Sequence, residues 1–537
     1  MRLTAADRDR TGRARYARTQ AAMAARCVDL LLLSRYESAH YVSGARRVQL
    51  AGGGGGAPWV VVFAGDQAPA VYTPDLDGVP QWIGAGRPMR WNPAALVAEI
   101  RSRAPRRLAY DLLTPHWLDM LREALPAAEW IDAEELIADV RAPHAAESIE
   151  GRLVVEEPSP FPPLRMQDGS TAIPELAQQR RMNVERAMAD AGIDGMVLFK
   201  PANLGYATGA RAAGGIVKAG APPLPLAEPT EADTNATTEC AARVAEALSG
   251  ARRVAIDRWS APLFTALRRA LPRIEWTDAD ALLGAERIVK LPAELVELRR
   301  AQELNEQAVT AVLEALRPGI REIDLTAVFH DALDALDDLG GAEVLVESVW
   351  CALPKARVEA PWAAPGTLPY RELTSERVLR EGDLVAMDTG ILHEGYMSDF
   401  GRTWRCGDGP ANGEERRLFE QWLEICERLM AACRPGNTAL SLRRAALAGW
   451  RRPEPPWPVP LYVAHSLGLG GVEPPFVGTD LGEAVEDRWL LRPGMVLVLE
   501  PYVWKEGVGG YRAEETVVVT EVGCERFTRF SYGAFDT

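Results

Sequence analysis

Features that would place this chain in a specialised class are scarce or missing. The 537 residues include only seven cysteines, an odd number, which are scattered and never spaced as Cys-x-x-Cys. We therefore expect reduced thiols rather than a disulfide framework. No apolar run approaches the roughly 18 residues that a membrane helix needs, and the charged stretch 1–19 is unlike a secretory signal. These absences predict a cytoplasmic protein with no membrane segment.

Clustered positive charge is also missing. Lysine and arginine total 60 against 75 aspartate and glutamate, the formal net charge is −15, and basic residues form no long block. Nucleic acids and anionic membrane surfaces are recognised by basic patches, so we expect neither as a partner. A zwitterionic or cationic small molecule is compatible with this charge. The length favours two to four domains.

The first half of the chain contains one pattern twice. Residues 23–46 align without a gap with residues 188–211, at an offset of 165. Residues 106–133 match residues 252–279 at an offset of 146. Strand-like runs alternate with helical runs in both copies, which predicts two α/β units. Neither copy carries a cluster of His, Asp and Glu, so we interpret both as structural or interface domains.

These patterns predict four segments. A first α/β domain covers residues 1–150, and a linker rich in Pro, Ser and Gly covers 151–175. A second α/β domain covers 176–288. The remaining chain, 289–537, alternates helical stretches with short apolar strands and is long enough for a further domain.

Two aspartates stand out in the stretch MDTGILHEGYMSDFGRTW, residues 387–404. A chain that folds back at His393–Glu394 would place Asp388 and Asp399 directly opposite each other on paired strands. Like charges in that arrangement destabilise a sheet. They are tolerated when one is protonated or when a cation lies between them. The pair therefore predicts a cation site.

Three further metal-ligand residues follow, each in or at the end of a strand-like run: His465, Glu500 and Glu514. Four carboxylates with one imidazole suit Mn²⁺, Fe²⁺, Co²⁺ or Zn²⁺. Such a set can hold two divalent ions, which together supply a nucleophile or base near neutral pH.

The order of these residues resembles the pita-bread superfamily of methionine aminopeptidase, Xaa-Pro aminopeptidase, prolidase and creatinase. The matching residues are Asp388, Asp399, Arg402, Thr403, His465, Glu500 and Glu514. The resemblance implies an α/β and α+β fold class, with two creatinase-type N-terminal α/β domains followed by a C-terminal pita-bread catalytic domain. It also implies that the two Asp, the His and the two Glu bind two divalent metal ions (Fe, Mn, Zn or Co), and that the protein is a homodimer.

Three positions depart from the peptidase pattern. Where peptidases of that superfamily carry further histidines, this chain has Tyr370, Leu461 and Val472. General acid–base groups contribute typically about 10²–10⁴-fold to a rate, so their loss disfavours amide hydrolysis. The chain is also similar to the dimethylsulfoniopropionate lyase branch, which lacks the same histidines. That branch has an extra acidic ligand and a proposed base at positions that are Gly390 and Gly471 in this chain.

The sequence therefore leaves three functions open. The first is a metal-dependent lyase that cleaves a C–S bond of a small sulfonium acid by β-elimination, with Glu473, Tyr462 or Tyr370 as the catalytic base. The second is a metallohydrolase of a C–N bond in a small substrate, similar to an Xaa-Pro dipeptidase or aminopeptidase. The third is a catalytically silent pita-bread binding module. The intact ligand set disfavours the third, and the missing histidines disfavour the second.

Overall fold

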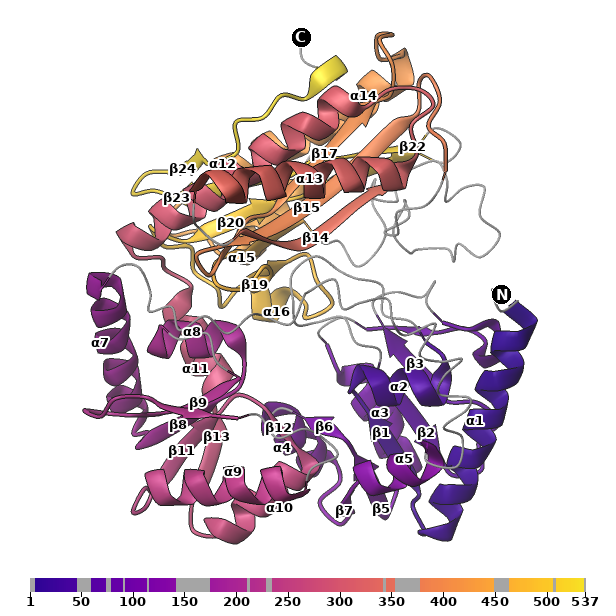
Figure 1. Ribbon diagram of the computed structural model, residues 1–537, viewed down its shortest axis with the longest axis vertical. Coiled ribbons are helices and arrows are strands. Elements are labelled where there is room, and N and C mark those ends of the chain that lie inside the picture. The colour runs from indigo at the N-terminus through magenta and orange to yellow at the C-terminus, as the bar shows by residue number, and fades with distance from the viewer. Residues whose placement is uncertain are drawn as a thin grey trace. The chain divides into compact units, whose positions relative to one another are not determined.

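The structure is a computed structural model. It describes residues 5–45, 59–73, 79–89, 92–113, 115–141, 174–209, 213–227, 234–340, 344–352, 377–448, 463–505 and 509–535. The described residues up to Glu286 form one compact unit, and those from Arg287 onward form a second (Figure 1). Most of the predicted linker 151–175 lies outside the described residues. Within the described ranges, no helix is long and apolar enough to cross a membrane.

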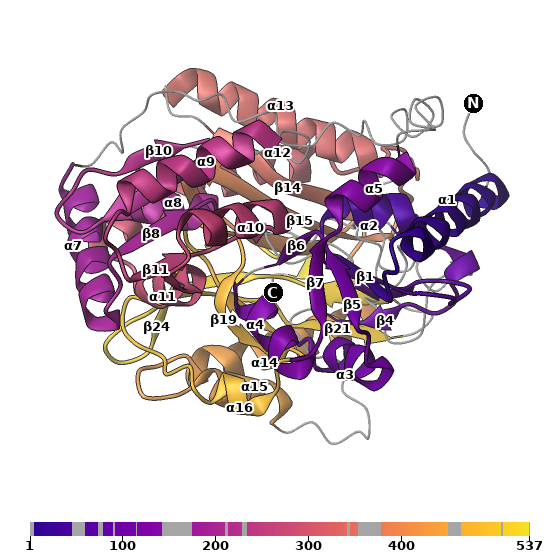
Figure 2. The ribbon, with the colours of Figure 1, turned by 90° about the horizontal axis from the view of Figure 1, so that it is seen from below.

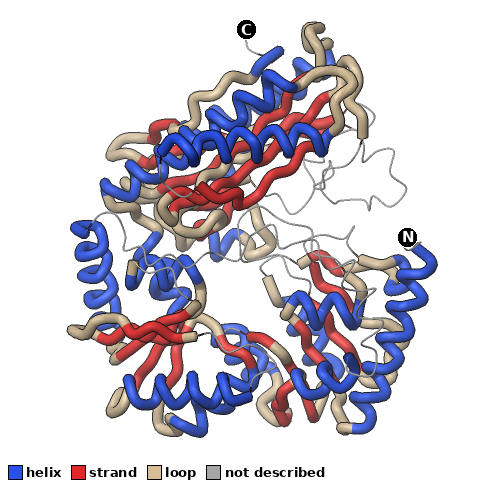
Figure 3. Tube along the Cα trace, in the orientation of Figure 1, coloured by secondary structure: helices blue, strands red, loops and turns tan. Residues whose placement is uncertain are grey.

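The first unit contains two α/β sheets flanked by helices (Figure 3). The first copy has the strand order β4-β3-β2-β1-β5-β7. Its strands are β1 (Leu30–Leu33), β2 (Trp59–Phe63), β3 (Ala70–Thr73), β4 (Arg87–Pro88), β5 (Arg107–Tyr110) and β7 (Glu129–Asp132). Its helices are α1 (Ala5–Ala25), α2 (Tyr36–Ser43), α3 (Ala94–Arg103), α4 (Pro115–Ala124) and α5 (Glu134–Arg141). Strand β1 is four leucines, all buried, as expected for a central strand covered on both faces.

The second copy repeats this topology with the order β10-β9-β8-β11-β13. Its strands are β8 (Gly195–Leu198), β9 (Gly214–Lys218), β10 (Leu224–Leu226), β11 (Arg253–Ile256) and β13 (Glu275–Asp278). Its helices are α7 (Pro174–Ala191), α8 (Pro201–Thr208), α9 (Thr234–Ala247), α10 (Ala261–Ala270) and α11 (Ala279–Arg287). Leu30 pairs with Leu108 in the first copy and Gly195 with Val254 in the second, which are equivalent positions at the two offsets.

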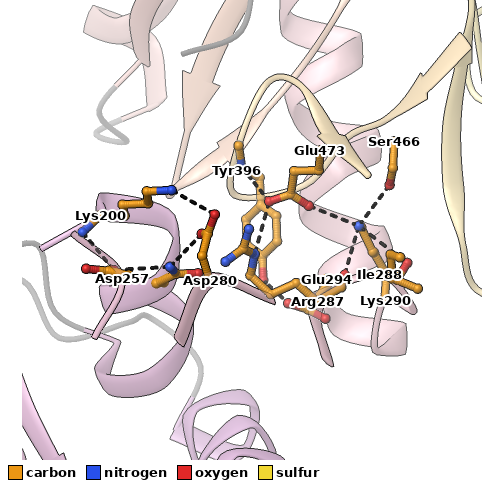
Figure 4. A network of polar contacts seen from close by, with 12 residues as sticks. Lys200, Asp257, Asp280, Arg287, Ile288, Lys290, Glu294, Tyr396, Ser466 and Glu473 are labelled. Carbon is orange, nitrogen blue, oxygen red and sulfur yellow. Dashed lines mark hydrogen bonds and ion pairs between the residues drawn. The ribbon is translucent and has the colours of Figure 1, made fainter. Parts of the chain in front are cut away.

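A buried aspartate is repeated with the fold. Asp111 accepts hydrogen bonds from the backbone N–H groups of Ser34 and Arg35, just before α2. Asp257, at the equivalent position, accepts them from the two residues just before α8, and the Lys200 bond is drawn in Figure 4. Each carboxylate thus satisfies backbone donors at the entry to a helix.

The two copies join through a short antiparallel pair, β6 (Leu112–Leu113) with β12 (Trp259–Ser260). Both strands are labelled in Figure 1, and Figure 2 shows β6 from below. Leu113 lies opposite Trp259, and these residues occupy equivalent positions at the offset of 146. One hydrophobic core contains buried residues of both copies. A contact of equivalent positions with each other is the signature of a twofold-related, self-complementary interface.

The described part of the second unit has two larger sheets and one two-stranded sheet, and helices pack against the larger ones (Figure 1). The first sheet contains β14 (Val344–Ala352), β15 (Leu384–His393), β16 (Tyr396–Met397) and β17 (Phe400–Arg405). It packs against α12 (Pro292–Ala315) and α13 (Glu322–Gly340). Strand β15 is buried along nearly its whole length, so its polar residues lie inside the unit.

The second sheet has the order β19-β18-β20-β23-β24. Its strands are β18 (Ala464–Ser466), β19 (Glu473–Val477), β20 (Val496–Leu499), β23 (Glu515–Val519) and β24 (Cys524–Arg526), with a separate hairpin of β21 (Tyr502–Lys505) and β22 (Gly509–Arg512). Helices α14 (Gly413–Ala432) and α15 (Ala439–Leu447) share its core, and the short α16 (Glu483–Glu486) follows β19. Helix α14 begins with a capping box formed by Asn412 and Glu415.

Candidate metal centre

Asp388 and Asp399 come from one hairpin, but they are not direct cross-strand partners. The two-residue turn between β15 and β16 is Glu394–Gly395. Both turn residues have positive φ, 48° and 86°, as a type I′ turn requires, and glycine adopts this conformation without strain. The predicted turn at His393–Glu394 is therefore wrong by one residue.

This shift keeps both aspartates on one face of the sheet. Asp388 lies opposite Gly401 on β17, and Asp399 precedes that glycine by two residues. Side chains alternate between faces along a strand, so a displacement of two residues preserves the face, and diagonal partners remain within reach of each other. Oxygens of Asp388, Asp399 and Glu514 all lie within 4.8 Å of one another.

The absence of a side chain at Gly401 makes room for Glu514. A Cβ atom on Gly401 would lie 2.8 Å from Glu514 Cδ and 2.9 Å from its Cγ. The backbone N–H of Glu514 donates to the Gly401 carbonyl at 2.9 Å. Gly401 therefore both positions the glutamate and leaves the space that its carboxylate fills.

His465 lies on β18, and Glu500 directly follows β20. The His465 Nε2 atom is 3.2 Å from Asp399 Oδ2 and 3.1 Å from Glu500 Oε1. All of these side chains are at most 7% exposed. The structure thus brings the five predicted ligands together, and their role as ligands remains a proposal.

Arg512 extends into the same cluster. Its guanidinium donates to Asp388 Oδ2 at 2.5 Å and to Glu500 Oε2 at 2.6 Å, and it also contacts Glu514. The side chain is only 10% exposed. Sequence reasoning missed this residue. The available signal was its place two positions before Glu514, since alternate residues of an extended segment share a face.

Arg402 and Thr403 hold the segment that carries these groups. Arg402 donates to the Glu514 carbonyl at 2.6 Å and to Glu515 Oε1 at 3.1 Å, and both charged side chains are 1% exposed. The Thr403 hydroxyl donates to the Arg512 carbonyl at 2.7 Å. The two residues therefore fix the backbone on either side of Ala513.

Proton affinities in the cluster are strongly shifted. Burial, reinforced by Asp399 and opposed by Arg512, raises the pKa of Asp388 to about 7. Burial alone would lower the pKa of His465, but its contacts with Asp399 and Glu500 raise it to about 10. Burial acts against the ionised form of Glu500, yet Arg512 and His465 lower its pKa to about 2. These pKa shifts arise because four carboxylates, an imidazole and a guanidinium share one buried site.

The residues fit a metal ion. Among the described residues, the buried atoms Asp388 Oδ1, Asp399 Oδ1 and Glu514 Oε2 have no hydrogen-bond partner. Buried polar atoms without partners are costly and rare. A divalent cation would satisfy all three, and an oxygen-rich set with one imidazole suits Mn²⁺, Fe²⁺, Co²⁺ or Zn²⁺.

The predicted catalytic bases are placed differently. Tyr370 and Tyr462 lie outside the described residues. Glu473 is 5% exposed, and its carboxylate is paired with Arg287 at 3.1 Å and Lys290 at 3.4 Å.

Comparisons with known families match most of the chain. The family described as metallopeptidase family M24 matches residues 296–521. The creatinase/prolidase N-terminal domain matches twice, over residues 15–142 and 180–289. These are the catalytic and duplicated regions that the sequence pattern distinguishes.

Several similar proteins are named as dipeptidases or prolidases. An Xaa-Pro dipeptidase of Pyrococcus furiosus is 30% identical over 259 residues, which cover 48% of this chain and 67% of that protein. A probable dipeptidase PepE of Mycobacterium tuberculosis is 29% identical over 375 residues, or 65% of this chain and 93% of that protein. The crystal structure of the prolidase from Pyrococcus horikoshii is 23% identical, with a TM-score of 0.52, and the match covers 66% of this chain and 99% of that one.

The fold and the buried carboxylate–imidazole cluster define a pita-bread protein with a site of the metalloenzyme type. The chain belongs to metallopeptidase family M24, with the creatinase-type N-terminal domain present twice. The predicted fold class is confirmed. Metallopeptidases of this family use two divalent metal ions, and this chain retains a matching acidic cluster.

The comparisons overturn the lyase interpretation. The three related proteins described above are named Xaa-Pro dipeptidase, probable dipeptidase and prolidase, which supports the alternative of a peptidase-type hydrolase. The lyase interpretation depended on the three missing histidines. Their loss removes proton-transfer groups, but it does not specify which bond is cleaved, because the same metal ligands can serve either reaction.

Proposed function

We propose that this protein is a metal-dependent hydrolase that cleaves a C–N bond in a small zwitterionic substrate, of the Xaa-Pro dipeptidase or aminopeptidase type. The observation that carries the proposal is the buried cluster of Asp388, Asp399, His465, Glu500 and Glu514, with its unpartnered carboxylate oxygens. The similarity to named dipeptidases supports the same reaction class.

The five side chains would hold two divalent ions. When bound, such ions polarise a carbonyl oxygen and lower the pKa of water, which is the chemistry that amide hydrolysis needs. Arg512 contributes positive charge on the Asp388 and Glu500 side of the cluster and orients both carboxylates. The burial of the cluster strengthens every one of these electrostatic interactions.

Transfer of a proton to the leaving amine requires a donor that Val472 cannot supply. Tyr370 and Tyr462 remain our candidates, because a phenol can exchange a proton directly. Glu473 is a third candidate, although its partners Arg287 and Lys290 hold its pKa below the ordinary value despite burial. We therefore expect a peptidase with slow hydrolysis or with a narrow range of substrates.

The decisive experiment is hydrolysis by the purified chain loaded separately with Mn²⁺, Fe²⁺, Co²⁺ or Zn²⁺. We expect release of proline from Ala-Pro or Gly-Pro, detected by mass spectrometry, and loss of that activity in Asp399→Ala. A protein that binds metal but cleaves none of a panel of Xaa-Pro and other dipeptides would contradict the proposal. Light scattering on the same sample tests the homodimer that the family resemblance implies, which a monomeric mass would exclude.

A further inference from the structure

The glycine-rich loop between β18 and β19 surrounds a buried ion pair. The loop joins Ser466 to Glu473, and these two residues are paired across the strands. Lys290, which precedes α12, lies with its Nζ atom 3.4 Å from Glu473 Oε2 (Figure 4). The Lys290 and Glu473 side chains are 3% and 5% exposed.

Lys290 and Glu473 each form further hydrogen bonds. Lys290 Nζ donates to the Arg287 carbonyl at 2.9 Å and to the Ser466 hydroxyl at 3.4 Å. Glu473 Oε1 accepts from Arg287 Nε at 3.1 Å and from the backbone N–H of Gly470 at 3.0 Å. The ion pair thereby connects the start of α12 with both ends of the loop.

The glycines in this loop have a steric explanation. A Cβ atom on Gly468 would lie 2.7 Å from Glu473 Oε2 and 3.1 Å from Lys290 Nζ. One on Gly470 would lie 3.2 Å from Glu473 Cγ. The glycines leave room for the ion pair, and the Gly468 carbonyl in turn accepts from the backbone N–H of Met397, on the hairpin that carries Asp399.

Stability alone does not explain these buried charges. Removing charges from water is costly, and buried ion pairs can often be replaced by apolar side chains without loss of stability. Burial lowers the pKa of Lys290, while Glu473 and Glu294 oppose that shift. An ion pair differs from apolar packing because its hydrogen bonds are directional. They fix the positions of the atoms that accept them.

The hydrogen bonds of this ion pair lead through Ser466 to His465. The Nδ1 atom of His465 lies 2.9 Å from the carbonyl oxygen of Ser466, the residue whose hydroxyl faces Lys290. With Nδ1–H donating to that carbonyl, Nε2 presents its lone pair to a metal ion. The same Nε2 atom is the one that faces Asp399 and Glu500.

We propose that the Lys290–Glu473 ion pair positions the imidazole of His465 in the metal centre, by fixing Ser466 and the loop that follows it. The inference rests on the proposed metal-dependent function. It makes Lys290 and Glu473 positioning residues, and it therefore competes with the interpretation of Glu473 as a catalytic base.

The test is a Co²⁺ titration of the full chain, followed by visible absorption and by proton NMR of the Co²⁺ form. The variants are Lys290→Met, Glu473→Gln, Ser466→Ala and the Lys290→Met/Glu473→Gln double variant. We expect roughly 10–100-fold weaker Co²⁺ binding in the charge variants, as for other residues that orient ligands. The exchangeable, paramagnetically shifted Nδ1–H signal of His465 should move or disappear, and the double variant should bind no more weakly than either single variant.

The control is Lys200→Met, which removes a different lysine–aspartate pair, with Asp280 at 2.7 Å in the first unit, and should leave Co²⁺ binding unchanged. Ser466→Ala keeps all charges, so it remains informative if a charge variant fails to fold. Unchanged Co²⁺ affinity and an unchanged Nδ1–H signal in all folded variants would overturn the inference. In that case a loss of turnover in Glu473→Gln would support the catalytic base. A wild-type protein that binds no Co²⁺ would overturn the metal-dependent function itself, and this inference with it.

Discussion

Asp388 lies opposite Gly401, and the carboxylate of Glu514 occupies the space that a side chain at position 401 would take. The relationship joins a strand of the first sheet to the segment that enters β23 of the second. It explains how three carboxylates from distant parts of the sequence come within 4.8 Å of one another.

Gly401→Ala should damage the metal centre without unfolding the protein. The added Cβ would lie 2.8 Å from Glu514 Cδ, so the carboxylate must move away from its partners. We expect metal binding weakened roughly tenfold or more, comparable to other changes around metal ligands. Isothermal titration calorimetry measures the effect. The matched control is Gly205→Ala in α8, where nothing lies within 4 Å of the new Cβ and binding should not change.

Arg512→Met should destabilise the metal-free protein more than the metal-bound protein. Its guanidinium is the partner of Asp388 and Glu500, and loss of one member of a buried ion pair costs about 3–5 kcal/mol. Bound divalent ions supply alternative positive charge. Thermal melting with and without excess metal should therefore show a deficit that shrinks when metal is added. Arg321→Met, which removes an exposed pair with Asp324, serves as control, and an equal deficit in both conditions would contradict the expectation.

Asp111 should make the stability of the first unit depend on pH. Burial raises its pKa from 3.8 to about 7, so the folded state binds the proton more tightly than the unfolded state between these values. This contribution to stability is present below pH 4 and is lost as pH rises through 7. Asp111→Asn does not titrate. Melting temperatures from pH 4.5 to 8.5 should therefore change in favour of the variant as pH rises, and a constant difference would show that Asp111 is ionised throughout.

Trp259→Ala should destabilise both copies of the duplicated domain. Trp259 is 3% exposed, pairs with Leu113 of the other copy and belongs to the core that the copies share. Truncation of a buried tryptophan costs about 3–5 kcal/mol. Hydrogen-exchange mass spectrometry should show lost protection in β5 as well as in β11. The control is Leu224→Ala, at a side chain that is 47% exposed. Loss confined to the second copy would indicate that the copies fold independently.

The sequence by itself determined the duplication and predicted the set of candidate ligands. Equivalent strands such as β1 and β8 recur with equal register because their buried apolar residues recur at a fixed offset. The five candidate ligands could be identified because each is a metal-binding residue type in or beside a strand, in an order that resembles a known family. The reaction could not be identified in this way, because positions such as Val472 show what is absent and not which bond is cleaved.

Tertiary structure alone decided the register of the hairpin and the partners of the candidate ligands. Placing the turn midway between Asp388 and Asp399 predicted it one residue too early, because this symmetry takes no account of the positive φ that Gly395 accommodates. The Arg512–Asp388 and Lys290–Glu473 contacts could not be predicted from patterns within one segment, since the partners lie 124 and 183 positions apart. Local sequence specifies which face a side chain occupies, whereas the packing of separate strands specifies which charges meet.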